Sequence, residues 1–321
     1  MKRREPVVGE RRRQRRLVPD ELLEPLDAAE GGRFEHVQLA VLGQEPARGL
    51  DVARVQGLQR RAPLHLDRDG TRRSPYGCAV STRVTDEERV VRERAGDHAR
   101  HALVPPEDAS ELALDALRLE PGASLELGDE LCDTLLFVHA GGGTLDGADL
   151  EGRCAGLVAA GARGTLLAGA GGLACVRATV GASTDLHAPM GTTESAVTLD
   201  HVEPGKATGA RSFQVLFGPH NGSTRATLFV GYIPPGKAPW HYHLYDEIVW
   251  VLRGEGRLHV GDAIEPLTPG CAFRLHAREV HIVENTQPSA ELAVLGIFTP
   301  AGSPSAAYLT PQIAATYVAG G

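Results

Sequence analysis

The chain has 321 residues, enough for two domains of ordinary size that each bury a hydrophobic core. Its formal net charge of -8 argues against nucleic acid as the main partner. Aromatic residues make up only 5% and 38 residues are glycine, which suits a turn-rich β protein better than a helical bundle. No apolar run is long enough to cross a bilayer, and no apolar segment follows the basic start, so we expect no membrane partner and no secretory signal.

The five cysteines also bear on the class of protein. They are odd in number, scattered, and never spaced as C-x-x-C. This usage is typical of reduced, mostly buried thiols in an intracellular protein. We therefore predict a cytoplasmic location.

Residues 1–75 differ from the rest of the chain. This Arg-rich extension carries about half of the basic residues and a single aromatic, Phe34. It has too little apolar surface to offset the entropy of ordering, so one interpretation is a disordered tail. A second is a start-site artefact, with the natural chain beginning near Val84. A third, less favoured interpretation is a basic arm for nucleic acid or anionic lipid.

From about Ser110 the pattern becomes that of β-strands. Residues 112–128 alternate apolar and polar side chains around a Pro-Gly turn. Residues 133–143 (DTLLFVHAGGG) form an apolar run that ends in glycines, and residues 247–256 (EIVWVLRGEG) have the same pattern. A Pro-Gly pair precedes both glycine turns by a similar distance, which indicates an internal repeat.

The strongest functional signal lies in the second copy of this repeat. Side chains at i and i+2 of a strand share a face, so His241 and His243 point the same way. We expect a short turn after them and then a partner strand, 247–252, that opens with Glu247. His281 arrives on a later strand, close enough in a β-barrel to complete the set. Three imidazoles and one carboxylate predict a site for one divalent metal ion.

These residues belong to two longer patterns. The first runs from Gly236 through H-x-H and the glutamate to Gly254, and the second runs from Gly270 through His281 to Asn285. Together they resemble the two signature motifs of the cupin superfamily, G-x5-H-x-H-x3,4-E-x6-G and G-x5-P-x-G-x2-H-x3-N. The resemblance implies an all-β fold of jelly-roll barrels in which H-x-H, Glu and His bind the metal. The alternative is four buried structural residues without a metal.

The departures from these motifs concern the turns. One residue is missing between Gly236 and H-x-H, and His276 and Arg278 replace the proline and glycine of the second motif. The four ligand positions are intact, whereas the turn before His281 departs from the family pattern.

The repeat and the resemblance together predict a bicupin, that is, two tandem cupin barrels. We assign a degenerate first barrel to residues 100–195 and a metal-binding barrel to 196–321. The first copy lacks an imidazole set, since other residues stand where the histidines belong: Leu127, Gly128, Asp129, Glu130 and Gly172. We expect the first barrel to have a structural role, covering an edge of the second and burying apolar surface between the halves; an organic ligand inside it stays an open alternative.

The predicted cofactor is one divalent ion, and Fe, Mn, Ni, Zn and Cu all suit three nitrogens and one oxygen. Four protein ligands leave open coordination positions, as catalysis requires. We therefore expect a metal-dependent enzyme for a small organic molecule, first of all an oxidoreductase of the dioxygenase type. Alternatives are a hydrolase, decarboxylase or isomerase, similar to the bicupin ureidoglycine aminohydrolase, or a non-enzymatic binding cupin. Oxalate-degrading bicupins usually carry metal in both barrels, which weakens that option here.

Three residues are candidates for catalysis. Glu247 is either a metal ligand or a general base. Arg278 and His276 lie in the turn that leads to His281, where a positive group would pair with a substrate carboxylate; a solvated surface turn is the equal alternative. No helix-turn-helix segment is recognisable, so we expect a small-molecule partner and no nucleic acid, and exposed strand edges would allow a homodimer.

Overall fold

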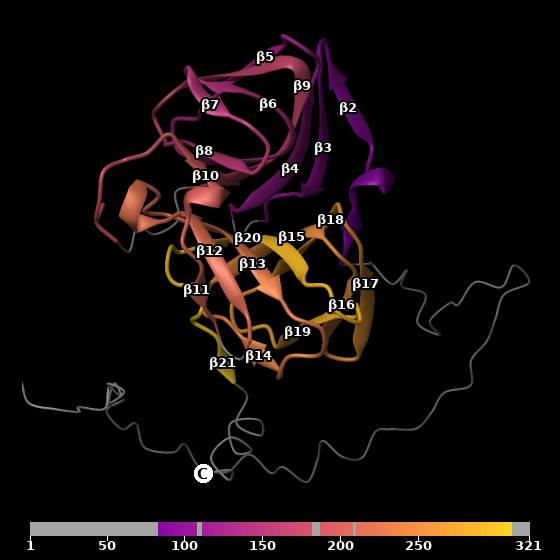
Figure 1. The fold of residues 1–321 in the computed structure, drawn as a ribbon. Coiled ribbons are helices and arrows are strands. Elements are labelled where there is room, and N and C mark those ends of the chain that lie inside the picture. Colours follow the sequence, from indigo (N-terminus) through magenta and orange to yellow (C-terminus); the bar gives the residue numbers. More distant parts are fainter. Residues whose placement is uncertain (1–82, 108–110, 182–186, 208–209, 310–321) are drawn as a thin grey trace, which may run out of the picture. The chain divides into compact units, whose positions relative to one another are not determined.

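The computed structural model describes residues 83–107, 111–181, 187–207 and 210–309 (Figure 1). The predictions for residues 1–75 lie outside the described residues. The regular elements of the described part are β-strands and three short 3-10 helices: η2 (Glu87–Arg89), η3 (Leu199–His201) and η4 (Pro219–Asn221). The expected all-β fold of two tandem jelly-roll barrels is confirmed. In the part of the chain that is described, no helix has the length and apolar character to cross a membrane.

One sheet builds the first barrel. Its order is β10-β8-β6-β9-β4-β3-β2, with β5 paired to β9 and β7 paired to β6. The strands are β2 (Arg92–Ala95), β3 (His98–Val104), β4 (Ala113–Leu119), β5 (Ser124–Leu127), β6 (Asp133–Leu145), β7 (Ala148–Leu150), β8 (Cys154–Val158), β9 (Gly164–Val180) and β10 (Ala196–Thr198). They therefore extend a few residues to either side of the range 100–195 that the sequence suggested.

The glycines at the end of the first repeat curve the long strand β6. The register of β6 against β9 shifts at two points around Gly141. A Cβ atom on Gly141 would collide with the carbonyl oxygen of Gly172, and one on Gly143 would collide with that of Leu167. Only glycine allows two backbones to approach this closely, so these positions let the strand bend around the barrel.

Two sheets build the second barrel. Their orders are β1-β18-β15-β20-β13-β12-β11 and β17-β16-β19-β14-β21. The strands are β1 (Thr85–Asp86), β11 (Gly205–Lys206), β12 (Ser212–Phe217), β13 (Thr227–Ile233), β14 (His241–Tyr242), β15 (Asp246–Arg253), β16 (Gly256–Val260), β17 (Ala263–Leu267), β18 (Cys271–Leu275), β19 (His281–Asn285), β20 (Leu292–Thr299) and β21 (Tyr308–Leu309). The short strand β1 precedes the first barrel in sequence but pairs with β18 of the second.

Strand β15 shows how alternation along one strand separates two apolar cores. Val249 and Val251 pack inside the second barrel. Ile248 and Trp250 point the other way, into a larger core that also contains Phe137 and other side chains of the first barrel. The two barrels thus bury apolar surface against each other, which is the structural role that we expected of the first barrel.

The inside of the first barrel is an aliphatic core. Its members include side chains that are at most 1% exposed, among them Leu117, Leu136, Val138, Leu166 and Cys175. These side chains come from three strands, β4, β6 and β9. Their packing fills the position that a ligand cavity occupies in the second barrel.

Candidate metal centre

Three imidazoles converge inside the second barrel. His241 on β14 and His281 at the start of β19 are direct partners across a strand pair, and His243 follows directly after β14. One ring nitrogen of each residue lies within 4.8 Å of the other two. Among the described residues, this is the one group of His, Cys, Asp or Glu side chains close enough together to hold a metal ion.

Backbone carbonyl groups fix the orientation of all three rings. The Nδ1 atoms donate over 2.9 to 3.2 Å to carbonyl oxygens of three nearby residues, namely Pro239 for His241, Ala306 for His243 and Glu279 for His281. Since a carbonyl oxygen can only accept, each Nδ1 carries the ring proton and each Nε2 keeps its lone pair. Carbonyl acceptors of this kind fix the tautomer and the ring orientation and so prepare histidines for a metal ion.

Burial keeps the three imidazoles neutral. Loss of hydration lowers the pKa of His241 to about 4 and that of His281 to about 3, and it also lowers the pKa of His243. The positive charge of Arg211 acts in the same direction on all three. A neutral imidazole is the form that binds metal, so protons do not compete for these nitrogens near neutral pH.

Glu247 lies beside this group. Its Oε2 is 3.7 Å from Nε2 of His243, and its side chain is 5% exposed. Burial raises the pKa of Glu247 to about 8, although the charge of Arg211 opposes the shift. Glu247 stands on β15 in the seven-stranded sheet, whereas His241 and His281 stand in the five-stranded sheet. Our expectation that 247–252 pairs with the H-x-H strand was wrong, because the site joins the two sheets.

A cavity of about 100 Å³ opens between the two sheets at this point. The three histidines and Glu247 line it, together with Arg211 and apolar side chains of both sheets. It has room for roughly seven to ten water-sized groups, which corresponds to a small organic molecule.

Comparison with known proteins identifies this barrel. Residues 228–298, which run from β13 to β20, match the Cupin_2 family, a cupin domain. The second barrel is therefore a cupin domain. No curated protein matches it in sequence.

Solved structures extend the similarity to both barrels. One is oxalate decarboxylase from Bacillus subtilis at pH 4.6, with 14% identity, coverage of 76% of this chain and 84% of that one, and a TM-score of 0.59. Another, of the same enzyme, is described by its Mn(II) centers, with 13% identity, 76% and 85% coverage and a TM-score of 0.59. The formate complex of Lactobacillus farciminis oxalate decarboxylase has 14% identity, 74% and 91% coverage and a TM-score of 0.59. This similarity confirms the bicupin fold.

Arg211 belongs to the cupin cavity although no motif includes it. It precedes β12, and within the described residues its guanidinium makes one hydrogen bond to protein, from Nη2 to the Val283 oxygen at 3.3 Å. Burial lowers its pKa, while the nearby carboxyl of Glu247 raises it. A partly buried guanidinium with several unused N–H donors is suited to a carboxylate ligand. The only sequence signal for Arg211 is a basic residue directly before an apolar strand, which is weak.

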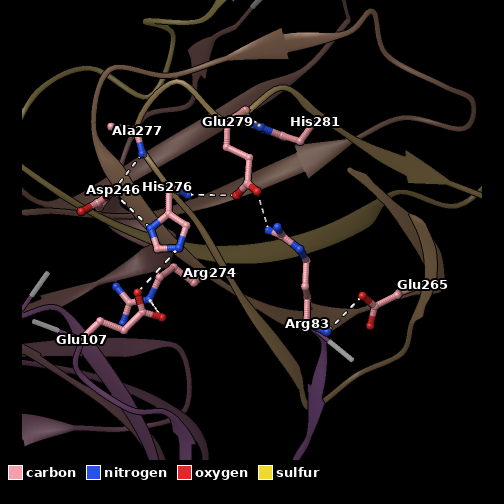
Figure 2. Close-up of polar contacts among 9 residues, drawn as sticks. All are labelled: Arg83, Glu107, Asp246, Glu265, Arg274, His276, Ala277, Glu279 and His281. Atoms are coloured by element: carbon pink, nitrogen blue, oxygen red, sulfur yellow. Dashed lines mark hydrogen bonds and ion pairs between the residues drawn. The ribbon is translucent and has the colours of Figure 1, made fainter. Parts of the chain in front are cut away.

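His276 and Arg278 do not reach the cavity. Both are exposed, and neither lines it. Figure 2 shows His276 between Glu107, 3.6 Å from its Nε2, and Asp246, 3.8 Å from its Nδ1. Arg278 has a φ of +66° where the cupin motif has glycine, and its backbone N–H donates to the His243 oxygen. The structure therefore gives this turn a positioning role, and the expected contact of His276 and Arg278 with a substrate is corrected.

The segment before β1 holds the same turn from outside the barrel (Figure 2). The guanidinium of Arg83 pairs with the carboxylate of Glu279 at 2.5 Å, and the backbone N–H of Arg83 donates to Glu265 at 3.0 Å. The carbonyl oxygen of Glu279 is the acceptor that orients His281. An ion pair from a distant part of the chain thus supports the backbone group that directs one imidazole.

Proposed function

We propose that the chain is a metal-dependent cupin enzyme that decarboxylates a small organic acid. In this proposal the three histidines hold one divalent ion, and Glu247, next to them, exchanges protons with the substrate. The observation that carries the proposal is the meeting of a neutral imidazole group, a protonatable buried carboxyl and the Arg211 guanidinium in one small cavity. The similarity to oxalate decarboxylases supports the reaction type, and the Mn(II) centers named for one of them favour manganese among the candidate ions.

The chain's own residues suit each requirement of this reaction. Decarboxylation breaks the bond to the leaving carboxylate carbon, leaves the electron pair on the remaining carbon, and replaces CO2 by a proton. Arg211 would bind and orient the carboxylate. Glu247 would deliver the proton, since burial favours its protonated form and a neighbouring cation favours its release. A bound divalent ion would supply Lewis acidity to the substrate oxygens.

The dioxygenase that we first expected becomes the second hypothesis. Both reactions suit a histidine-bound ion, so the ligand set does not separate them. Decarboxylation, however, consumes a proton and no dioxygen, and a buried carboxyl with a pKa of about 8 is the group that this balance calls for. The solved structures of similar fold are decarboxylases as well.

The test is to measure two gases at once. The purified chain is loaded in turn with manganese, iron, nickel, zinc and copper, and each form is incubated with a panel of small carboxylic acids. We expect CO2 release without matching dioxygen uptake, and loss of this activity in Glu247→Gln protein that still binds metal. Dioxygen uptake equal to the substrate consumed would restore the dioxygenase hypothesis. Ligand binding without turnover for every ion would make the chain a binding protein and overturn the proposal.

A further inference from the structure

We infer that the cupin cavity binds a monocarboxylate with a compact apolar body, and that oxalate is not its ligand. This inference rests on the proposed function only for the carboxylate itself. The reasons are the charges and the walls of the cavity, which differ from what a small dianion needs.

Positive charge in the cavity comes from one protein side chain. Among the described residues that line it, Arg211 alone has a permanent positive charge. The buried carboxyl group of Glu247 lies in the same space. Besides an ion held by the histidines, the guanidinium of Arg211 can pair with one carboxylate of a ligand, and no second basic side chain among the described lining residues would pair with another.

The rest of the wall is mainly apolar. The seven-stranded sheet contributes side chains that are between 2% and 8% exposed, namely Phe229, Ile233, Val249, Leu275 and Val294. Two of the four hydroxyl groups that line the cavity are already engaged; the lining residues that carry them are Ser212, Tyr232, Tyr245 and Ser305. That of Tyr232 donates to Gln214 at 2.6 Å, and that of Ser305 lies 2.8 Å from the Ser303 hydroxyl. A hydrocarbon group would find matching contacts here, as in most small-molecule sites.

Gly231 leaves space within this wall. It stands between Phe229 and Ile233 on the face of β13 that lines the cavity. A Cβ atom on Gly231 would lie 3.3 Å from the Phe229 ring and 3.4 Å from a methyl group of Val294. The missing side chain therefore widens the apolar part of the cavity, and larger side chains at this position would reduce it.

Oxalate does not match these walls. It consists of two joined carboxylates, so oxygen atoms form almost its whole surface. Arg211, a bound ion and the hydroxyl groups of Ser212 and Tyr245 would serve some of these oxygens, but the remainder would face phenyl and aliphatic groups. Burying a polar group without a partner is unfavourable, whereas benzoate, with nine non-hydrogen atoms, would direct one carboxylate to Arg211 and a ring to the wall.

The inference is tested by calorimetric titration of the full chain with four probes: benzoate, benzamide, acetate and oxalate. Benzamide has the shape of benzoate without its charge. We expect benzoate to bind at least about tenfold more tightly than each of the others, since the loss of a charge-assisted contact or of apolar burial costs this much. Metal-free protein is titrated in parallel, and metal content is measured after each run, because free oxalate itself removes divalent ions. Oxalate binding as tightly as benzoate in both forms would overturn the inference.

Two variants assign the preference to its residues. Arg211→Gln should remove the difference between benzoate and benzamide, and Arg211→Lys should keep part of it. Gly231→Val should weaken benzoate binding while leaving acetate unchanged, with Gly231→Ala in between. Thermal unfolding shows whether each variant is folded. Benzoate and benzamide binding equally to folded wild-type protein would also contradict the role of Arg211.

The outcomes separate this inference from the proposed function. If benzoate is preferred but no acid loses CO2, decarboxylation fails and the ligand class stands. If acids lose CO2 and oxalate is the best of them, the ligand class fails and decarboxylation stands.

Discussion

The two barrels share one fold but differ in what their inward positions carry. Strand β6 of the first barrel points Leu136 and Val138 into an aliphatic core. The corresponding strand of the second repeat, β15, presents Glu247 and Val249 to a cavity. The strand geometry fixes where a side chain points, and the residue type then decides whether that place becomes core or site.

The difference also has an energetic side. Burying three imidazoles and a carboxyl around a cavity is unfavourable for folding, because these groups lose their hydration. In the first barrel the core cluster around Leu136 and Val138 is apolar, and the outer face contributes Phe137 and its neighbours to the shared core. We infer that the first barrel stabilises the molecule and thereby offsets the polar groups of the second.

The largest effect is expected at the imidazoles. His243→Ala removes one of three converging nitrogens. Loss of a group that merely holds a ligand in place already costs about 10- to 100-fold in metal affinity, so we expect a loss of more than about 100-fold here. Metal content after dialysis, measured by elemental analysis, is the test. Arg278→Ala is the matched control on the neighbouring turn, because its side chain is exposed and should leave the metal content unchanged. Equal metal in both variants would mean that the histidines form a structural core.

The next largest effect concerns the shared core. Phe137 is fully buried between the barrels, and Phe137→Ala should lower the free energy of unfolding by about 3–5 kcal/mol through the cavity it leaves. Thermal or urea unfolding measures this. The metal-to-protein ratio of the folded variant should not change, because Phe137 does not line the site. Leu167→Ala, at a 43% exposed position of the same barrel, should have little effect. Loss of metal from folded Phe137→Ala protein would contradict the division of roles, in which the first barrel stabilises the molecule and the second barrel binds the metal.

The metal centre was the most predictable part of the molecule. His241, His243 and Glu247 lie close together in sequence, and strand parity with motif spacing was enough to bring them together with His281. Asn285 ends the second motif, and its amide donates to the carbonyl oxygens of Ile233 and Ala290, both at 2.8 Å. Local geometry decides these positions, so the sequence contains their signal.

Long-range pairing decides the rest, and sequence spacing carries little of it. Arg211 reaches the cavity because β12 pairs with β13 and so enters the sheet of Glu247. The separation of β14 and β15 into different sheets likewise depends on partners far along the chain. The expected position of Arg278 at the substrate was wrong for a local reason. The left-handed backbone at this turn directs the side chain outward, while the backbone N–H of Arg278 donates to the carbonyl oxygen of His243.

A smaller effect, on pH dependence, would sharpen the role of Glu247. With a pKa of about 8, its carboxyl holds a proton below that pH in the absence of metal, and a nearby cation must expel it. Metal affinity should therefore rise with pH, by up to about tenfold per unit, until it levels near pH 8. The imidazoles of His241 and His281, with pKa values of about 4 and 3, add no slope above pH 5. Metal titrations of the wild-type protein between about pH 5.5 and about pH 8.5 measure the slope.

Glu247→Gln is the control for this profile. The amide does not titrate, so the slope should vanish. Above pH 8 the variant also separates two roles, because a lost ligand weakens affinity by more than about 100-fold, whereas a lost neighbour of the ligands costs about 10- to 100-fold. The proposed proton carrier requires the smaller loss. A flat wild-type profile would place the carboxyl too far from the ion for either role.

The smallest effect is expected at the turn that the sequence suggested for substrate binding. His276 is exposed; its contact with Glu107, at 3.6 Å, joins the second barrel to the segment that follows β3, and its contact with Asp246, at 3.8 Å, lies within the second barrel. Exposed ion pairs contribute about 0–1 kcal/mol, so His276→Ala should shift unfolding by no more than that and should leave metal affinity and ligand binding unchanged. Unfolding curves and benzoate titrations of the same preparation measure both quantities. A tenfold loss of ligand affinity in this variant would return His276 to the site and would mean that the turn closes over the cavity when a ligand binds.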